Sequence, residues 1–416
     1  MLFNRRDINT LPFTGVEDWQ YGNETKVLEE QSKNQNAKSM RSGLFLKWIH
    51  LRLKLTLTKV LIREYKNPID WMLGLQYLIK LRRRFLGNQR LKKMACVDGK
   101  YYMGLYTPGW RSTVYERFIA SELNGFKKTK SPTYRFNHVF LAITKKCALQ
   151  CEHCYEWDNL NKKDVLSEDT LHGIVHRIQQ LGTAQIHFTG GEPMLKVDIL
   201  LSLMKRSAGG TNFWMNTSGL KLTAINARRL KQAGLTGVFI SLDHFSAEEH
   251  NKFRNFKDAF YWAQEGARNA LNSGLVVAYS ICMRKEFVSE ENIQRFMDLA
   301  KETGVHFVQF LEPKAVGHYK SSDVTLGTEQ IRLLESVFLK MNFSDNFSSY
   351  PIITYHGYYQ RRQGCFSAGK KGLYVDTDGD INPCTFCHKK SGNILDPKID
   401  NLLATMTAAG CPTYTS

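Results

Sequence analysis

The chain has 416 residues, enough to bury a full hydrophobic core and to form two or three structural units. Hydrophobic residues make up 43% and charged residues 23%, which are ordinary globular values, and no uncharged apolar run approaches the roughly 18–20 residues of a membrane-spanning helix. The net charge of +18 predicts attraction to an acidic partner, such as nucleic acid, an anionic membrane or a polyanionic substrate.

Residues 1–40 are polar and lack periodicity, which predicts a mobile leader. The first residues, MLFNRRDINTLPF, have no apolar run after the arginines and do not resemble a signal peptide. We therefore expect a cytoplasmic protein, in peripheral contact with the inner membrane surface at most, whose nine cysteines stay reduced. Their uneven grouping at 147–154 and 384–387 predicts metal binding rather than disulfides.

The excess charge is concentrated in one segment. Between Arg41 and Lys93, fourteen basic residues accompany two acidic ones, so this segment carries +12 of the total. Apolar residues at helical spacing predict a helix from about Leu44, and Asn67-Pro68 predicts the start of a second helix. We expect residues 41–135 to form a basic, mainly helical N-terminal extension.

Two interpretations of residues 44–93 stay open. The helices either pack against the rest of the protein, or they use an apolar face with Trp48 and Trp71, beside a basic face, to lie on an anionic membrane. Basic residues between Lys80 and Lys93 add attraction to such lipids. Nucleic acid or an acidic leader peptide is a weaker alternative, because no nucleic-acid-binding motif accompanies the charge.

From residue 136 onward, apolar strand candidates alternate with amphipathic helices. Six such β-then-α units predict a parallel sheet with helices packed outside, and hence an α/β fold. A further helix at 328–341, capped by Thr328, and a hairpin around Asp378-Gly379 are expected after them. The strand candidates are 138–144, 184–189, 211–216, 236–241, 275–282 and 305–311.

Cys147, Cys151 and Cys154 directly follow the first strand candidate, where a β-to-α loop belongs. Such loops converge at the carboxyl ends of parallel strands, which is the edge that carries the chemistry in barrels of this type. Three cysteines ligate three irons of a four-iron cube and leave the fourth iron open for a small ligand. A zinc site closed by His153 or His172 is the alternative that the triad leaves open.

Beyond the triad, the sequence resembles the radical SAM superfamily over about residues 136–315. Gly190–Pro193 resembles the GGEP motif that contacts the amino group of S-adenosylmethionine (SAM), and Asn216–Gly219 resembles the TNG-type turn. Ser241–Asp243 resembles the motif near the ribose, with His244 in place of the usual glycine, which puts the local loop geometry in doubt. The residues that the resemblance assigns to SAM binding are Tyr155, Gly190, Gly191, Glu192, Pro193, Asn216, Ser218, Ser241 and Asp243.

The resemblance implies a partial (βα)6 TIM-type barrel over residues 136–318. It also implies a [4Fe–4S] cluster on the triad, which cleaves SAM and produces a 5′-deoxyadenosyl radical that abstracts a hydrogen atom. An electron donor such as flavodoxin or ferredoxin is the implied partner. The sequence assigns no catalytic acid, base or hydrogen donor.

The C-terminal cysteines resemble the opening signature of SPASM and twitch auxiliary domains. Cys365 and Cys384 flank Gly379 at the characteristic spacing, and Cys387 and Cys411 follow. A full SPASM domain needs more cysteines than remain, so the count favours the twitch form, with one auxiliary [4Fe–4S] cluster in a small domain at 361–416, after a helix and linker at 319–360. Zinc is again the alternative.

The sequence thus predicts a radical SAM oxidoreductase-type enzyme, in which an auxiliary cluster assists oxidation or bond formation. The substrate is unidentified, and a ribosomal peptide, a membrane-associated lipid and a small alcohol remain open. The rival interpretation is a non-catalytic zinc-binding module. Four residues lie at or near strand ends and could either line the pocket or be structural, namely Tyr155, Glu156, Glu312 and His318. Cys96 and Cys282 are expected to be buried as small apolar residues with no role in function.

Overall fold

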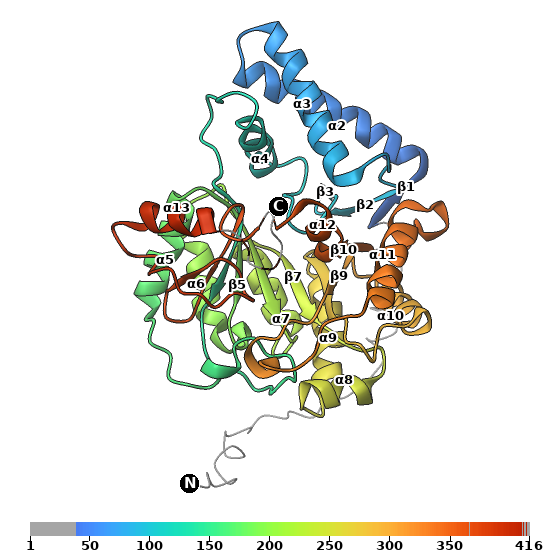
Figure 1. Ribbon diagram of the computed structural model, residues 1–416, viewed down its shortest axis with the longest axis vertical. Coiled ribbons are helices and arrows are strands. Elements are labelled where there is room, and N and C mark those ends of the chain that lie inside the picture. Colours follow the sequence, from blue (N-terminus) through green and yellow to red (C-terminus); the bar gives the residue numbers. More distant parts are fainter. Residues whose placement is uncertain (1–38, 366, 410, 412, 414–416) are drawn as a thin grey trace. The chain divides into compact units, whose positions relative to one another are not determined.

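Nine strands form the central sheet, in the order β10-β9-β8-β7-β6-β5-β4-β11-β12 (Figure 1). The structure is a computed structural model that describes residues 39–365, 367–409, 411 and 413. The predicted leader at 1–40 falls outside these residues except for its last two positions. Neighbouring strands of the sheet are parallel, apart from the antiparallel pair β11 and β12.

The six predicted strands are confirmed and lie side by side in sequence order, with helices between them. Consecutive βα units in an open parallel sheet are the architecture of a partial barrel, so the predicted α/β fold class is correct. The strands are β4 (Phe136–Ala142), β5 (Thr183–Thr189), β6 (Asn212–Thr217), β7 (Leu235–Ser241), β8 (Val276–Cys282) and β9 (Phe307–Leu311). The helices are α5 (Glu168–Gln180), α6 (Val197–Lys205), α7 (Ala224–Gln232), α8 (Ala247–Arg254), α9 (Ala259–Asn272), α10 (Glu290–Thr303) and α11 (Thr328–Phe343).

Alternation of side chains along the strands creates two cores. On one face, residues such as Val139 and Ile186 are fully buried against the helices. On the other face, Trp214 and Phe239 pack with Leu105 and other residues of the N-terminal segment. The segment before β4 therefore covers part of the barrel interior.

One edge strand, β10, and one strand pairing, that of β11 with β4, were not predicted. β10 (Ile352–Tyr355) extends the sheet beside β9, in a stretch where the sequence indicated a loop. The predicted hairpin is confirmed as β11 (Gly372–Val375) and β12 (Ile381–Asn382), but β11 also pairs with β4 and so joins the barrel sheet. Helices α12 (His356–Gln363) and α13 (Ile399–Ala409) flank this hairpin in the sequence.

The cap predicted for α11 is wrong by one residue. Gly327 is the N-cap, and Thr328 is the first residue of the helix. The backbone N–H of Gly327 donates to Oε1 of Gln330, so a side chain three residues inside the helix satisfies the cap position.

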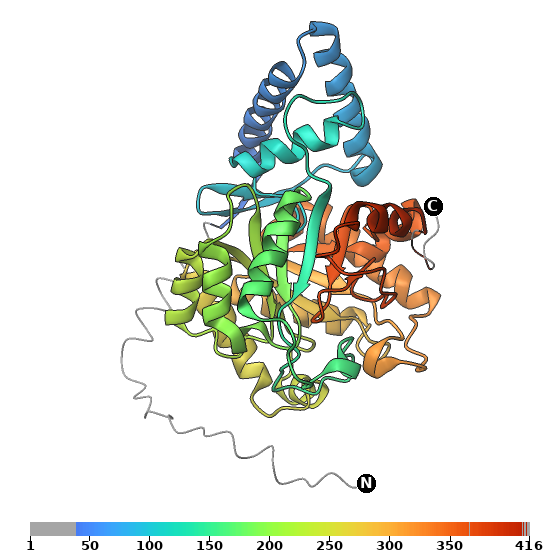
Figure 2. The same cartoon turned by 90° about the vertical axis from the view of Figure 1, so that its left-hand side faces the viewer.

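Three helices pack together in the N-terminal segment, namely α2 (Gly43–Glu64), α3 (Pro68–Leu86) and α4 (Thr113–Leu123) (Figures 1 and 2). The two helices predicted in the basic segment are confirmed. Asn67 caps α3 as expected, because its side chain accepts a hydrogen bond from the N–H of Ile69. A small antiparallel sheet of β1 (Met40–Ser42), β2 (Lys93–Val97) and β3 (Lys100–Tyr102) completes this segment. In the described part of the chain, none of the helices combines the length and apolar character needed to span a membrane.

Candidate functional site

Cys147, Cys151 and Cys154 lie together in the loop that follows β4, at the carboxyl edge of the sheet. Cys151 is buried and the other two are half-buried, with Leu149 and Ala259 packed around them. Burial, followed by the neighbouring Cys151, raises the pKa of Cys154 to about 12. Thiols that hinder one another's ionisation in this way become good ligands when a cation compensates their charge.

Hydrogen bonds from three other parts of the chain hold this loop. The N–H of His318 donates to the carbonyl of Cys154 at 2.9 Å, and the N–H of Glu152 donates to the carbonyl of Phe253 at 3.1 Å. The N–H of Cys147 donates to Oδ1 of Asn161 at 3.0 Å. The spacing of the triad is therefore fixed by the fold rather than by a metal alone.

The two glycines after β5 allow the triad loop to approach the strand end. A Cβ atom on Gly190 would collide with the carbonyl oxygen of Thr144, and one on Gly191 would collide with the carbonyl oxygen of Lys146. Gly190 also has a φ of 128°, which side chains rarely tolerate. The two glycines therefore make room for the backbone beside Cys147.

Glu192 connects the ends of β5 and β6. Its buried carboxylate accepts hydrogen bonds from the backbone N–H and the hydroxyl of Ser218, at 2.7 and 2.5 Å, and from the hydroxyl of Thr217 at 2.7 Å. Its side chain also caps the short 3-10 helix that begins at Pro193. Burial raises the pKa of this carboxyl group. The two sequence motifs that contain these residues therefore form one connected unit.

Asp243 already has a partner in the protein. Its fully buried carboxylate binds the guanidinium group of Arg254 at 2.5 and 2.7 Å and accepts the N–H of Cys282 at 2.9 Å. Nη1 of Arg254 also lies 3.5 Å from the sulfur of Cys151. Sequence reasoning missed Arg254, because its place eleven residues after Asp243 follows no spacing rule.

Open polar groups remain at neighbouring strand ends. Oδ1 of Asn216, at the end of β6, is buried and has no hydrogen-bond donor among the described residues. The hydroxyl of Tyr155 shares a 3.0 Å hydrogen bond with Thr189 at the end of β5. Ser241 ends β7 and is partly exposed. A buried acceptor without a donor is costly, so Asn216 is suited to receive a donor from a ligand.

The four C-terminal cysteines also come together. Burial, together with the nearby thiols of Cys387, Cys365 and Cys411, raises the pKa of Cys384 to about 11. A backbone hydrogen bond from Gly369 to Pro383 ties the two sides of the hairpin together. Among the described residues, no group of three or more His, Cys, Asp and Glu side chains is spaced to hold a single metal ion.

The C-terminal cysteine loop contacts the triad loop. The ring of Tyr155, next to Cys154, lies 6.2 Å from Phe386 and 6.3 Å from His388. Nζ of Lys145 forms a 2.5 Å ion pair with Asp378 in the hairpin. Both groups of thiols therefore lie at the same end of the sheet.

Other candidates from the sequence have structural partners. The carboxylate of Glu156 accepts a hydrogen bond from the hydroxyl of Tyr374, and that of Glu312 accepts hydrogen bonds from the side chains of Tyr355 and Arg361. The ring of His318 stacks on the ring of Trp157, with 3.7 Å between the ring centroids. The two histidines of the zinc alternative lie elsewhere in the packing: His153 stacks on Phe253, and His172 hydrogen-bonds Ser202. The remaining cysteines are Cys96 in β2, which is half-buried, and Cys282 in β8, which is buried.

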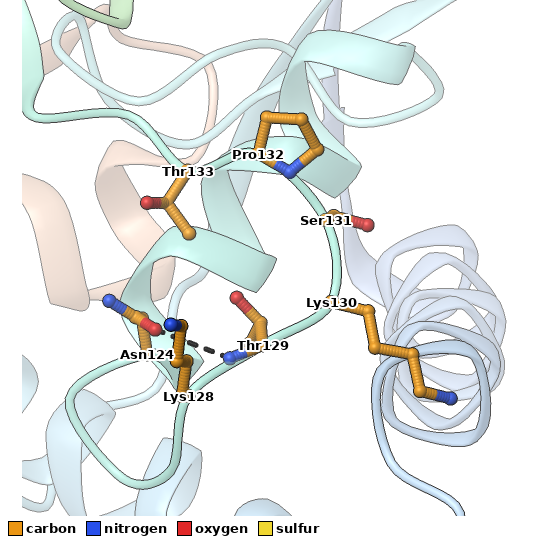
Figure 3. A pocket seen from close by; sticks show the side chains of 7 residues that line it. All are labelled: Asn124, Lys128, Thr129, Lys130, Ser131, Pro132 and Thr133. Atoms are coloured by element: carbon orange, nitrogen blue, oxygen red, sulfur yellow. Dashed lines mark hydrogen bonds between the residues drawn. The ribbon is translucent and has the colours of Figure 1, made fainter.

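A separate hollow lies in the loop between α4 and β4 (Figure 3). Its volume is about 500 Å³, and none of the residues assigned to SAM or metal lines it. Glu64 holds this loop, because it accepts the N–H groups of Lys130 and Ser131. The lining residues are Asn124, Lys128, Thr129, Lys130, Ser131, Pro132 and Thr133.

Comparison with known proteins identifies the sheet and its cysteine loop. Residues 141–309 match the model of the Radical SAM superfamily. This part of the chain is a radical SAM domain. Enzymes of this superfamily cleave SAM at a [4Fe–4S] cluster and require a reductant.

The chain is similar to several characterised radical SAM proteins. It is 28% identical over 193 residues to the Fe-coproporphyrin III synthase of Methanosarcina barkeri, a match that covers 46% of each chain. It is 25% identical over 269 residues to the GTP 3',8-cyclase of Moorella thermoacetica, which covers 61% of this chain and 82% of the cyclase. The chain thus spans about half the length of the first of these relatives.

A solved structure shares the fold. The structure of Streptococcus suis SuiB bound to precursor peptide SuiA superimposes with a TM-score of 0.52 at 12% identity. The match covers 83% of this chain and 80% of that one. At this identity the likeness concerns the fold.

The residues present fit the superfamily's cofactors. Three converging thiols provide ligands for three irons and leave a fourth iron position without a protein ligand. The buried acceptor on Asn216 lies at the same edge of the sheet and suits a ligand that carries hydrogen-bond donors.

Proposed function

We propose that this radical SAM enzyme holds two [4Fe–4S] clusters and oxidises its substrate or forms a bond within it. The observation that carries the proposal is the contact between the two cysteine loops through Tyr155, Phe386 and His388. When bound, the clusters supply an electron that splits SAM into methionine and a hydrogen-abstracting 5′-deoxyadenosyl radical, and an acceptor for the electron left on the substrate.

In this proposal, Cys147, Cys151 and Cys154 ligate the SAM-cleaving cluster. Cys365, Cys384, Cys387 and Cys411 ligate the auxiliary cluster. The SAM molecule would lie along the strand ends, where the open acceptor of Asn216 is available to a donor. The residues proposed to contact SAM are Tyr155, Gly190, Gly191, Glu192, Pro193, Asn216, Ser218, Ser241 and Asp243.

Within this group, Glu192 and Asp243 act mainly by positioning. The carboxylate of Glu192 is occupied by Ser218 and Thr217, so it fixes the strand end on which SAM would lie. The carboxylate of Asp243 is occupied by Arg254 and by the N–H of Cys282. We therefore propose that Asp243 acts on the ribose region by fixing the backbone there.

The substrate classes proposed are a ribosomal peptide, a membrane-associated lipid and a small alcohol. The reaction requires the substrate to lose a hydrogen atom to the deoxyadenosyl radical, then one electron to the auxiliary cluster and one proton to a base. A low-potential protein such as flavodoxin or ferredoxin is the proposed electron donor.

Anaerobic purification followed by iron and sulfide analysis tests the proposal. We expect two clusters per chain, and Cys384→Ala should remove about half of the iron while SAM cleavage to 5′-deoxyadenosine persists. Cys147→Ala should abolish SAM cleavage and leave the auxiliary cluster. Cys96→Ala is the matched control and should change neither quantity. Zinc in place of iron at both sites would favour the rival, a non-catalytic zinc-binding module.

A further inference from the structure

Helix α2 has two apolar stripes on opposite faces. One stripe, which includes Leu46, Ile49 and Leu61, is buried in the core that α2 shares with α3 and α4. The other stripe consists of Leu44 and the residues four, seven, eleven and eighteen positions after it. These spacings are close to whole numbers of helical turns, so the side chains lie on one face of the helix. These exposed residues are Leu44, Trp48, Leu51, Leu55 and Ile62.

The exposure of the second stripe is high. Leu44 is 81% exposed, and Leu51 and Leu55 are each 57% exposed. Helix α3 repeats the arrangement, since Leu78 and Gly74 are buried while four apolar residues lie exposed on the other side. Those four are Ile69, Met72, Leu73 and Ile79.

The outward apolar residues are concentrated on these two helices. Ten of the fifteen exposed large hydrophobic side chains in the described part of the chain lie on α2 and α3. Exposed apolar patches of this kind mark interaction sites, whereas isolated apolar residues on a surface need no explanation. We name the exposed apolar residues of α2 and α3, from Leu44 to Ile79, the outer face.

Basic side chains flank the outer face on both sides. On α2, Lys47 and Lys54 project on one side of the exposed stripe, and Arg52 and Lys59 project on the other. The guanidinium group of Arg52 lies over the ring of Trp48 at 4.3 Å. Within the described structure, Lys47, Lys54 and Lys59 form no ion pair. On α2 the outer face is therefore apolar along its centre and cationic along both edges.

We propose that the outer face docks the enzyme onto an anionic membrane surface. Exposed Leu, Ile and Trp side chains would enter the boundary between headgroups and acyl chains, while Lys and Arg contact anionic headgroups. A second copy of the chain suits this face poorly, because two such surfaces would bring like charges together and because lysine is depleted in protein interfaces. The proposal concerns where the enzyme works and holds for each of its proposed substrate classes.

Co-sedimentation of the full chain with lipid vesicles tests the proposal. We expect binding to vesicles of phosphatidylcholine mixed with phosphatidylglycerol, weak binding to phosphatidylcholine alone, and loss of binding at high salt. Leu51→Ser with Leu55→Ser should weaken binding at least about tenfold, since each leucine loses its transfer into the membrane. Lys54→Glu with Lys59→Glu should weaken it at least as much.

The control is Val165→Ser with Ile225→Ser, which removes two comparably exposed apolar side chains outside the outer face. This variant should bind vesicles like the unchanged protein. Because all these residues are exposed, each variant should keep its melting temperature, which shows that it is folded. Equal binding by the leucine variant would overturn the proposal, and so would a dimer that dissociates in that variant.

Discussion

At the scale of single residues, the buried pair of Asp243 and Arg254 connects the end of β7, where we propose that SAM binds, to Cys151 of the triad. One guanidinium group binds the carboxylate at 2.5 Å and reaches the sulfur of Cys151 at 3.5 Å. Both side chains are almost completely buried. A positive charge beside a ligand sulfur favours its ionised form and offsets negative charge on a bound cluster.

We predict that Arg254→Gln lowers the free energy of unfolding by about 3–5 kcal/mol, because it leaves the Asp243 carboxylate buried without a counter-charge. Adding Asp243→Asn should recover a large part of that loss, since no buried charge then remains. Urea unfolding of the two variants measures both effects. The double variant should still retain less iron than the wild type, because Cys151 has lost its cationic neighbour. A double variant as unstable as the single one would contradict this account.

At the scale of elements, the turn after β5 packs directly against the backbone of the triad loop. The backbone there is so close to Lys146 that a methyl group on Gly191 cannot be accommodated without movement of the loop. The end of strand β5 therefore helps to fix the backbone on which Cys147 stands.

We predict that Gly191→Ala displaces the loop at Cys147 and lowers iron loading on the triad, with little change in auxiliary iron. Electron paramagnetic resonance of the reduced protein, with and without SAM, distinguishes the two clusters. Gly173→Ala is the control, because a Cβ atom there meets nothing within 4 Å. Normal SAM-dependent spectra from Gly191→Ala would show that the close approach is not needed.

Helix α2 is tied to the loop before β4 by Glu64. Burial acts to raise the pKa of this carboxyl group, but hydrogen bonds from the side chain and backbone of Ser131 and from Arg63 bring its pKa below the ordinary value of 4.5. A carboxyl group with a lowered pKa in the folded state contributes stability above its unfolded pKa, and that stability is lost as the pH falls through the folded pKa.

We therefore predict that Glu64→Gln costs about 2 kcal/mol of unfolding free energy at neutral pH, since the bonds of Ser131 lose a charged acceptor. The difference between variant and wild type should shrink well below pH 4.5, where the wild-type group is also protonated. Urea midpoints across this pH range check the prediction. A difference that does not vary with pH would contradict it.

At the scale of the whole molecule, the C-terminal segment is part of the barrel sheet. Strand β11 pairs with β4, and Leu373, Val375 and Ile381 belong to the same core as the barrel strands. This pairing brings the triad loop and the loop of the C-terminal cysteines to the same end of a single sheet.

We predict that a chain ending at Gln363 does not fold into a stable barrel. Such a chain lacks β11, so the edge of β4 is left unpaired and the core residues that β11 covers are exposed to water. Circular dichroism and solubility measure the outcome. The full chain carrying Cys384→Ala and Cys387→Ala is the control and should stay folded. A soluble truncated chain with a cooperative transition would show that the segment is separable.

The sequence by itself determined most of the elements and predicted a metal-binding role for the triad. Six strands and the helices between them were predictable because their hydrophobic patterns are local. Asn67 indicated the start of α3 because its side chain accepts a hydrogen bond from the nearby N–H of Ile69. Cys147, Cys151 and Cys154 could be predicted as cluster ligands because their spacing within one loop resembles a ligand pattern. The leucines that alternate along residues 51–57 belong to two opposite stripes on one helix.

Only the tertiary structure decided which residues meet across the sheet. The pairing of β11 with β4, the position of β10, and the contact of Arg254 with Cys151 join positions that lie far apart in the chain and follow no local period. The same holds for the outer face of α2, because a sequence shows that a leucine is apolar but not whether another helix covers it. Burial is a property of the packed molecule, and for that reason the site's supporting residues and its exposed surface emerged only from the fold.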